Sequence, residues 1–214
     1  MHIPDGFLDL WICGLFYALS SIMIFISIRK VHGKIGGERT PLLGLVSAGI
    51  FAVQMLNWPI PGGTSAHFVG GALAAIVLGP FAGVLSMFSV VLIQALLFGD
   101  GGLLTLGANL FNMAIVDVLA GWYVYKLLRK FSKSLVAFFA GWLGIFLAAI
   151  AAGIEIGLSS SFGYELEVTL TVMGVWHGIL GVIEGAVTLM VVRFIQQTRP
   201  DLVFGGVTSN AEPN

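Results

Sequence analysis

Charged residues are scarce in this sequence, and their scarcity excludes a soluble globular domain. Only 10% of the 214 residues are Asp, Glu, Lys or Arg, whereas 57% are hydrophobic. Soluble domains carry about 25% charged residues, so this composition predicts a protein that crosses a lipid bilayer several times. The net charge of −1 says little about partners, and we expect no nucleic acid among them.

Other absences narrow the chemistry. Cys13 is the single cysteine, which excludes an internal disulfide and a multi-cysteine metal site. The sequence has neither a His-Glu-x-x-His zinc-protease helix nor a Gly-x-x-x-x-Gly-Lys-Ser/Thr phosphate-binding loop. We therefore predict that the chain is not an enzyme, and that ATP hydrolysis coupled to its function takes place on separate subunits. A basic region typical of a cleaved signal peptide is also missing, so Met1 is expected to remain the N-terminus.

Seven apolar stretches predict an all-α bundle of seven transmembrane helices. The longer stretches reach the roughly 20 residues that a helix needs to cross the hydrocarbon core of a bilayer. We predict one transmembrane domain over residues 1–195 and a flexible polar tail over residues 196–214. The predicted spans are residues 8–28, 41–56, 64–79, 81–98, 103–128, 134–158 and 168–194.

The basic residues predict how this bundle is oriented. All ten lie in or beside the connections that follow the first, fifth and seventh spans, which share one side of a seven-span bundle. The positive-inside rule makes that side cytoplasmic. The N-terminus and the loops at 57–65 and 99–102 are then expected outside, and the C-terminus in the cytoplasm. The ten residues are Arg29, Lys30, Lys34, Arg39, Lys126, Arg129, Lys130, Lys133, Arg193 and Arg199.

The first two residues offer three nitrogen donors. Met1 supplies an α-amine, and His2 supplies its backbone nitrogen and its imidazole, so together they can close two fused rings on one metal ion. The alternative interpretation is a frayed chain end. Pro4 is predicted at the second position of a type I turn with Asp5 and Gly6, and this turn would return Met1 and His2 to the bundle.

His67 is a candidate for a fourth nitrogen donor. It is expected in the first turn of the third helix, after Thr64 or Ser65 as the cap, on the same side of the membrane as His2. By itself it could equally be a structural histidine at a helix N-terminus. Four nitrogens in a plane suit Ni(II) or Cu(II) rather than Zn(II), which prefers a tetrahedron. Metal binding would weaken as the pH falls, because the donors must lose their protons.

Further polar residues are candidates for supporting the metal site or for holding the helices together. Asn109 and Asn112 lie three residues apart on one helix face, and they could orient a bound imidazole or bridge helices. His177 and Glu184 share a face of the last span, and with Asp117 they are interpreted as a structural cluster rather than a proton path. Thr64 and Ser65 are also candidates beside His67.

Several motifs resemble the substrate-capture M subunit of nickel and cobalt energy-coupling-factor (ECF) transporters, the NikM/CbiM family. The resemblance covers nearly the whole chain, and its first two motifs are highly specific. The matching stretches are Met1-His2-Ile3-Pro4-Asp5-Gly6-Phe7, Gly62-Gly63-Thr64-Ser65-Ala66-His67, Gly70-Gly71, Gly79-Pro80, Gln94, Phe98-Gly99-Asp100-Gly101-Gly102, Gly107-Ala108-Asn109, Asn112-Met113, His177 and Glu184-Gly185.

The resemblance implies a capture subunit in a prokaryotic inner membrane, with one extra N-terminal helix compared with vitamin-type capture subunits. It also implies metal ligands at the Met1 amine, at the His2 amide and imidazole, and at His67. Expected partners are a transmembrane coupling subunit, two ATPase subunits and a small accessory membrane subunit. No organic cofactor is expected.

The sequence favours one metal ion, and a second remains as the alternative. The Ile3-Pro4-Asp5-Gly6 opening is similar to the nickel branch of the family, and a square plane of nitrogens favours Ni(II). The alternative is capture of Co(II) for cobalamin biosynthesis. Two hypotheses of other classes are a membrane haem or redox protein with His67 and His177 as axial ligands, and a passive channel or sensor.

Overall fold

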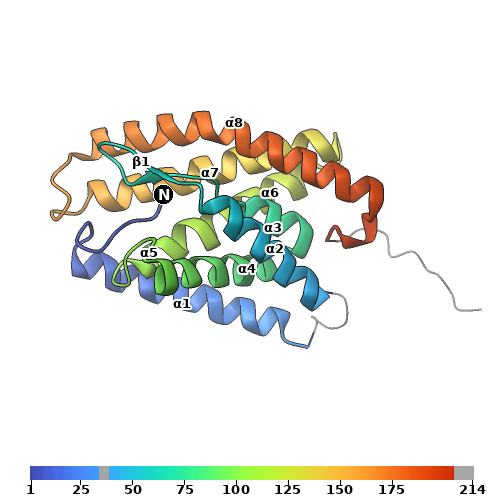
Figure 1. Cartoon of the computed structure of the whole chain (residues 1–214), viewed down its shortest axis with the longest axis horizontal. Helices are drawn as coiled ribbons and strands as arrows, with labels where there is room; N and C mark the ends of the chain where they lie inside the picture. The colour runs from blue at the N-terminus through green and yellow to red at the C-terminus, as the bar shows by residue number, and fades with distance from the viewer. Residues whose placement is uncertain (34–38, 205–214) are drawn as a thin grey trace, which may run out of the picture.

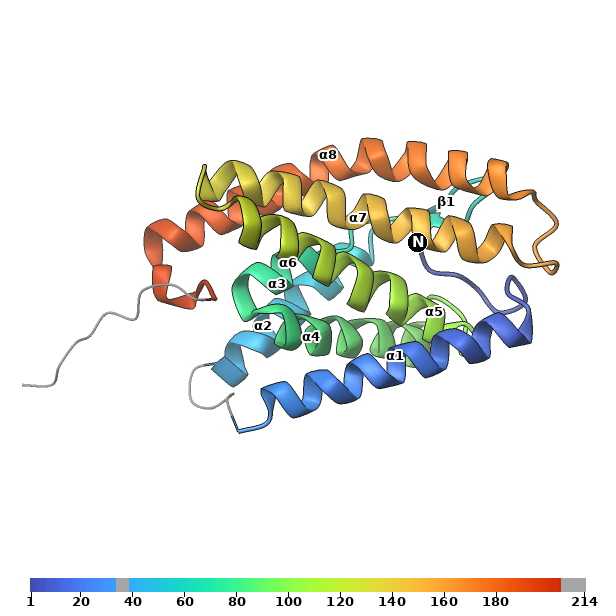
Figure 2. The same cartoon turned by 180° about the vertical axis from the view of Figure 1, so that it is seen from behind.

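The computed structural model describes residues 1–33 and 39–204, which form a bundle of long helices (Figures 1 and 2). The shorter elements include two strands, two π-helical turns and one 3₁₀ turn. The helices are α1 (Leu10–Val31), α2 (Arg39–Gln54), α3 (Gly71–Leu78), α4 (Pro80–Ile93), α5 (Leu106–Leu110), α6 (Asp117–Leu128), α7 (Lys133–Gly157) and α8 (Leu166–Thr198). The strands are β1 (Trp58–Pro59) and β2 (Ser65–Ala66), the π-helical turns are Gln94–Phe98 and Phe111–Val116, and the 3₁₀ turn is Pro200–Leu202.

The described residues contain seven helical segments, because one π-helical turn extends α4 and the other joins α5 to α6. Five of these segments are long and apolar enough to cross a membrane. Many large hydrophobic side chains of α1 and α8 are exposed on the bundle surface, as expected for helices that face lipid. The helical bundle and the number of segments therefore agree with the sequence analysis.

The third predicted span, residues 64–79, is not one helix, and this part of the prediction is wrong. Residues 64–70 contain no helix: Ser65–Ala66 form β2, which pairs with β1 in antiparallel register, with Trp58 opposite Ala66. The non-helical stretch ends at Gly70, whose φ of +81° lies in the left-handed region, and α3 begins at Gly71. Thr64 and Ser65 therefore do not cap a helix.

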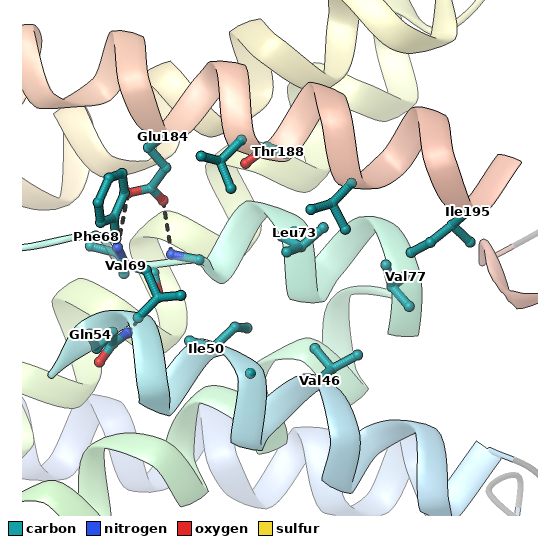
Figure 3. A pocket seen from close by; sticks show the side chains of 15 residues that line it. Val46, Ile50, Gln54, Phe68, Val69, Leu73, Val77, Glu184, Thr188 and Ile195 are labelled. Atoms are coloured by element: carbon teal, nitrogen blue, oxygen red, sulfur yellow. Dashed lines mark hydrogen bonds between the residues drawn. The ribbon is translucent and has the colours of Figure 1, made fainter. Parts of the chain in front are cut away.

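Side chains from distant helices satisfy the backbone of this non-helical stretch. Glu184 of α8 accepts hydrogen bonds from the backbone nitrogens of Val69 at 2.9 Å and Gly70 at 2.8 Å (Figure 3). Asp117 of α6 accepts one from Gly71 at 2.8 Å, where α3 begins. Gln54 donates to the carbonyl of Val69 at 2.5 Å. Non-helical backbone at membrane depth is tolerated only where protein groups satisfy it, so these buried side chains allow residues 64–70 to stay non-helical.

Replacement of Glu184 by alanine is expected to destabilise the bundle. The buried N–H groups of Val69 and Gly70 would lose their acceptors, and each unpaired buried group costs about 1–3 kcal/mol. Thermal unfolding in detergent should show a clearly lower midpoint for Glu184→Ala. The exposed Glu167, in the first turn of α8, provides the matched control. Equal midpoints for Glu184→Ala and Glu167→Ala would contradict this role of Glu184.

Glycines let α7 and α8 approach each other closely along their lengths (Figure 2). A Cβ added to Gly141 would lie 2.7 Å from Thr188 Oγ1, and one added to Gly185 would lie 2.6 Å from the Phe138 carbonyl oxygen. Small residues are the usual means of close helix packing in lipid. The Gly-rich composition thus serves internal packing at these positions.

The C-terminal part of the chain is more ordered than the sequence analysis expects. Residues 196–198 continue α8, and Phe204 turns back to donate its backbone N–H to the Ile76 carbonyl of α3 at 3.1 Å. The remaining residues of the predicted tail, 205–214, lie outside the described part of the chain.

The two ends of the bundle differ in charge. The described helix ends that carry basic residues lie at the end opposite the N-terminus and β1 (Figure 1). Which end faces the cytoplasm stays a prediction of the positive-inside rule.

Candidate metal centre

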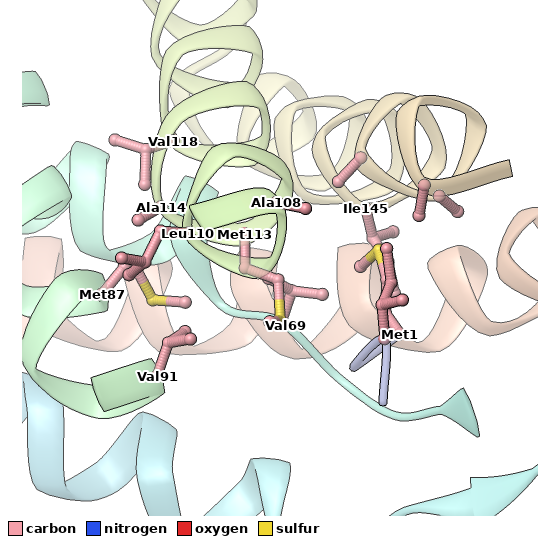
Figure 4. Close-up of a cluster of buried hydrophobic side chains, with 14 of the residues drawn as sticks. Met1, Val69, Met87, Val91, Ala108, Leu110, Met113, Ala114, Val118 and Ile145 are labelled. Atoms are coloured by element: carbon pink, nitrogen blue, oxygen red, sulfur yellow. The ribbon is translucent and has the colours of Figure 1, made fainter. Parts of the chain in front are cut away.

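The N-terminal segment enters the bundle and is buried there. Met1 is 0% exposed and belongs to the same core cluster as Met113 and Ile145 (Figure 4), and His2 is 3% exposed. A turn at residues 4–7 redirects the chain, with the Phe7 N–H donating to the Pro4 carbonyl at 3.4 Å. The turn differs from the predicted one, because Pro4 is its first residue. Gly6 is its third residue, with φ +90°, as a type II turn requires.

The backbone of Ile3 fixes the position of the two residues that precede it. The Ile3 N–H donates to Asn109 Oδ1 at 2.8 Å, and the Ile3 carbonyl accepts from Asn109 Nδ2 at 3.0 Å. The same carbonyl accepts from the backbone of Gly102 at 3.0 Å and from Thr105 Oγ1 at 2.5 Å. Asn109 therefore holds the backbone beside His2 rather than an imidazole.

Asp5 fastens the N-terminal segment a second time. Its carboxylate accepts hydrogen bonds from the backbone nitrogens of Leu103, Leu104 and Thr105 at 3.1, 2.8 and 3.2 Å, just before α5 begins. A carboxylate is favourable near a helix N-terminus, where backbone N–H groups lack partners within the helix. Ile3 and Asp5 are thus both anchored to residues 102–109.

Substitution of Gly102 by alanine is expected to weaken metal binding by about 10–100-fold, which is the usual cost of losing a residue that orients a ligand. A Cβ at Gly102 would overlap the carboxylate and backbone nitrogen of Asp5, so the N-terminal segment would have to leave its position. Isothermal titration with nickel measures the effect. Gly14→Ala, which meets no atom within 4 Å, is the matched control. Unchanged affinity in Gly102→Ala would show that the segment need not be fastened here.

The imidazoles of His2 and His67 lie face to face, with ring centroids 4.5 Å apart and ring planes 20° from parallel. His2 Nε2 donates to Gln94 Oε1 at 3.2 Å, and His67 Nδ1 donates to the Phe68 carbonyl at 2.5 Å. Because these acceptors fix the tautomers, His2 Nδ1 and His67 Nε2 each keep a free lone pair. Both atoms are buried and have no hydrogen-bond partner. Each ring therefore presents one nitrogen that is available to a metal ion.

Two further nitrogens belong to the backbone. The Met1 amine donates to the carbonyl oxygen of Ser65 and, at 2.7 Å, to Ser65 Oγ. Of the residues that the structure describes, none accepts a hydrogen bond from the backbone N–H of His2. A buried N–H without a partner is rare in native structures. The amine, this amide and the two bare imidazole nitrogens make up the four donors that the sequence analysis expects.

Burial lowers the pKa of the Met1 amine and of the His2 imidazole. The pKa of the Met1 amine falls well below its ordinary value because burial removes its hydration, although the charge of Asp100 opposes the change. The pKa of His2 falls to about 3 through burial and then through the nearby N-terminal charge. Burial thus favours the neutral forms of the amine and of the His2 imidazole, which are the forms that bind a metal ion.

Side chains alone do not make this site. Among residues 1–33 and 39–204, no group of three or more His, Cys, Asp or Glu side chains is arranged to hold a metal ion. Four donors are reached only when the amine and the His2 backbone nitrogen are counted. His67, which is predicted in a helix, lies in the non-helical stretch between β2 and α3.

The other predicted site residues form hydrogen bonds of their own. Ser65 accepts from the Met1 amine, and Thr64 Oγ1 faces the sulfur of Met173 at 3.9 Å. Asn112 donates to Glu155 Oε2 at 2.7 Å and so bridges two helices. His177 donates to the carbonyl of Met173 in its own helix at 2.9 Å, and its Nε2 has no partner. Glu184 and Asp117 hold adjacent backbone groups of residues 69–71, which is the structural part predicted for them, whereas the hydrogen bond of His177 is to Met173 in its own helix.

Sequence reasoning missed the residues that hold the ligands. Gln94 and Asp100 contact His2 from more than 90 positions along the chain, and Asp5 fastens the N-terminal segment to residues 103–105; none of the three is predicted from the sequence as a site residue. One signal was available. Asp100 lies in a Gly-Asp-Gly-Gly turn on the side predicted for His2, where an acidic residue among glycines could contact a cation.

Comparisons with known proteins agree with a metal transport component. The family described as "Cobalt uptake substrate-specific transmembrane region", CbiM, matches residues 2–202. A solved structure described as a transition metal transporter superposes with a TM-score of 0.89 at 37% identity, covering 92% of this chain and 93% of that one.

Curated relatives carry both nickel and cobalt names. A candidate fused nickel transport protein, NikMN, of Archaeoglobus fulgidus is 60% identical over 95% of this chain and 68% of its own length. The fused nickel transport protein NikMN of Rhodobacter capsulatus is 36% identical over 95% of this chain and 64% of its own length. The cobalt transport protein CbiM of Geobacter sulfurreducens is 33% identical over 95% of this chain and 61% of its own length. The chain therefore belongs to the CbiM family of substrate-specific transmembrane regions, and it is a multi-pass protein of the prokaryotic membrane.

Proposed function

We propose that this protein captures Ni(II) with high affinity for uptake into the cell. The ligands are the Met1 amine, the backbone nitrogen and Nδ1 of His2, and Nε2 of His67. The observation that carries the proposal is the pair of stacked imidazoles, which each keep one buried, unpartnered nitrogen beside the buried N-terminus. Such nitrogens are costly to bury without a partner, and a bound cation offsets that cost.

Two arguments support nickel over cobalt. A set of four nitrogens that includes a deprotonated amide suits the square-planar preference of Ni(II). The fused proteins named for nickel, at 60% and 36% identity, are also more similar to this chain than the cobalt protein of Geobacter, at 33%. Capture of Co(II) for cobalamin biosynthesis remains the second candidate, and the family description names cobalt uptake.

The sequence contains no phosphate-binding loop, so ATP hydrolysis that drives uptake would have to take place on other subunits. We infer that this chain works with an ECF transmembrane coupling subunit, with ATPase subunits and with a small accessory membrane subunit. Uptake of radioactive nickel by cells that express this chain should then require active ATPase subunits. Uptake that continues when the ATPases are inactivated would favour a passive channel instead.

Metal analysis of the purified protein tests the capture proposal. Protein with a free Met1 amine is dialysed against equal concentrations of nickel and cobalt, and the bound metals are then counted. We expect one metal ion per chain, with nickel in excess. Preferential retention of cobalt would assign the protein to the second candidate function, and a strong Soret band with no bound nickel would favour a haem protein.

A further inference from the structure

The metal site is closed to water, so an arriving cation has to meet another group first. Met1 and His67 are 0% exposed and His2 is 3% exposed. The side chain of Asp100 is 18% exposed, and its Oδ1 lies 3.2 Å from His2 Nδ1. This carboxylate therefore contacts both the solvent and one of the proposed ligands.

The carboxylate of Asp100 is held in this orientation. Asp100 lies in a tight turn between Gly99 and Gly101, whose φ values are +64° and +85°. The backbone N–H of Asp100 donates to the Gln94 carbonyl at 3.1 Å. Asn57, in the loop before β1, donates to Asp100 Oδ2 at 2.7 Å. Because Oδ2 is engaged by Asn57, Oδ1 remains directed at His2.

Asp100 Oδ1 and His2 Nδ1 lie 3.2 Å apart without the geometry of a hydrogen bond. The side-chain oxygen of Gln94 faces His2 Nε2 and favours the tautomer that carries its proton on that nitrogen. Two electron-rich atoms thus face each other at 3.2 Å. That separation fits two neighbouring ligands of one cation, because ligands about 2.0–2.2 Å from a metal ion lie roughly 3 Å apart when the angle between them is near 90°.

We propose that Asp100 is the first ligand of the incoming divalent transition metal ion, which it holds together with His2 Nδ1 before the ion passes to the four nitrogens. This inference rests on the proposed capture function and adds the route by which the cargo enters. On transfer, the bond from the metal to the carboxylate oxygen breaks and bonds to the amine, the His2 amide nitrogen and His67 form. The amide proton is taken up by the Asp100 carboxylate that the metal ion has released, and this carboxylate is partly exposed to solvent.

A ligand used only on the way in changes rates more than affinity. The carboxylate attracts the cation to the entrance and exchanges one of its water ligands early, so association is faster than with the nitrogens alone. Electrostatic attraction of this kind raises association rates by about 10–10³-fold. Loss of a charge at the rim of a binding site changes mainly the association rate and its dependence on salt.

Stopped-flow mixing of nickel with the purified full chain tests the proposal. For Asp100→Asn we expect an association rate at least tenfold lower, with a weaker dependence on ionic strength. The dissociation constant should change by a smaller factor than the association rate. Asp100→Glu, which keeps the carboxylate, should recover part of the rate. Glu167→Gln removes one charge from the exposed start of α8 and should associate at the rate of the unmodified protein.

Two results would overturn the proposal. An unchanged association rate in Asp100→Asn would mean that the cation enters without this carboxylate, and loss of equilibrium binding as complete as in His67→Ala would make Asp100 a permanent ligand. If Asp100→Asn fails to fold, Asn57→Ala gives a second reading, because it keeps the charge but frees the carboxylate to turn. Slower association in Asn57→Ala supports the proposal and an unchanged rate overturns it. If the unmodified protein binds no nickel, the capture function fails instead.

Discussion

Replacement of His67 by alanine is expected to abolish one-to-one nickel binding. The substitution removes one of the four nitrogens and leaves the His2 ring without its stacking partner. The affinity should fall by more than the roughly 100-fold that follows loss of a residue which only orients a ligand. Isothermal titration with nickel, together with metal analysis after dialysis, measures the loss.

The matched control for this variant is His32→Ala. His32 is exposed at the end of the bundle opposite the N-terminus, so its removal should leave nickel affinity unchanged. Thermal unfolding of both variants shows whether the fold survives. Nickel bound by His67→Ala at one ion per chain and with unchanged affinity would remove His67 from the ligand set.

Acetylation of the Met1 amine should eliminate nickel binding as completely as the loss of His67. The acetyl group converts the amine to an amide, which removes its basic lone pair and prevents the first chelate ring. The amine is also fully buried against Ser65, so the structure leaves no free space for the added group. Cell-free synthesis started with N-acetylmethionine or with methionine gives two chains that differ only at this position.

The acetylated chain needs its own folding control, because the buried N-terminus also belongs to the core cluster. Equal thermal unfolding midpoints before metal addition would show that only the metal site has changed. One nickel ion per chain bound by the acetylated protein at normal affinity would rule out the amine as a ligand.

Much of the helical bundle could be predicted from the sequence, because long apolar stretches in a chain with few charges have little alternative in lipid. The exception is the stretch that carries His67. An apolar run after Thr64 and Ser65 reads locally as a capped helix, but Glu184 and Asp117 bond to the backbone of residues 69–71 from other helices. Such tertiary contacts leave no local signal, so propensity and capping rules assign the wrong structure.

The candidate ligands were easier to predict than the residues that hold them. Met1, His2 and His67 are recognisable because chelation needs nitrogen donors at particular spacings. The fastening of Ile3 by Asn109 and of Asp5 by residues 103–105 depends on how two loops meet in space. The turn at residues 4–7 was predicted one position out of register, since the positive φ of Gly6, and not Pro4, determines its type.

X-ray absorption at the nickel edge of the loaded protein tests the central claim most directly, because it reports the atoms bound to the metal. We predict four nitrogen neighbours in a square plane, two of them imidazole nitrogens, with no sulfur and no lasting carboxylate ligand. The His67→Ala chain, which is expected not to retain nickel, should not give this spectrum. A six-coordinate shell dominated by oxygen in the unmodified protein would contradict capture by the N-terminus, His2 and His67.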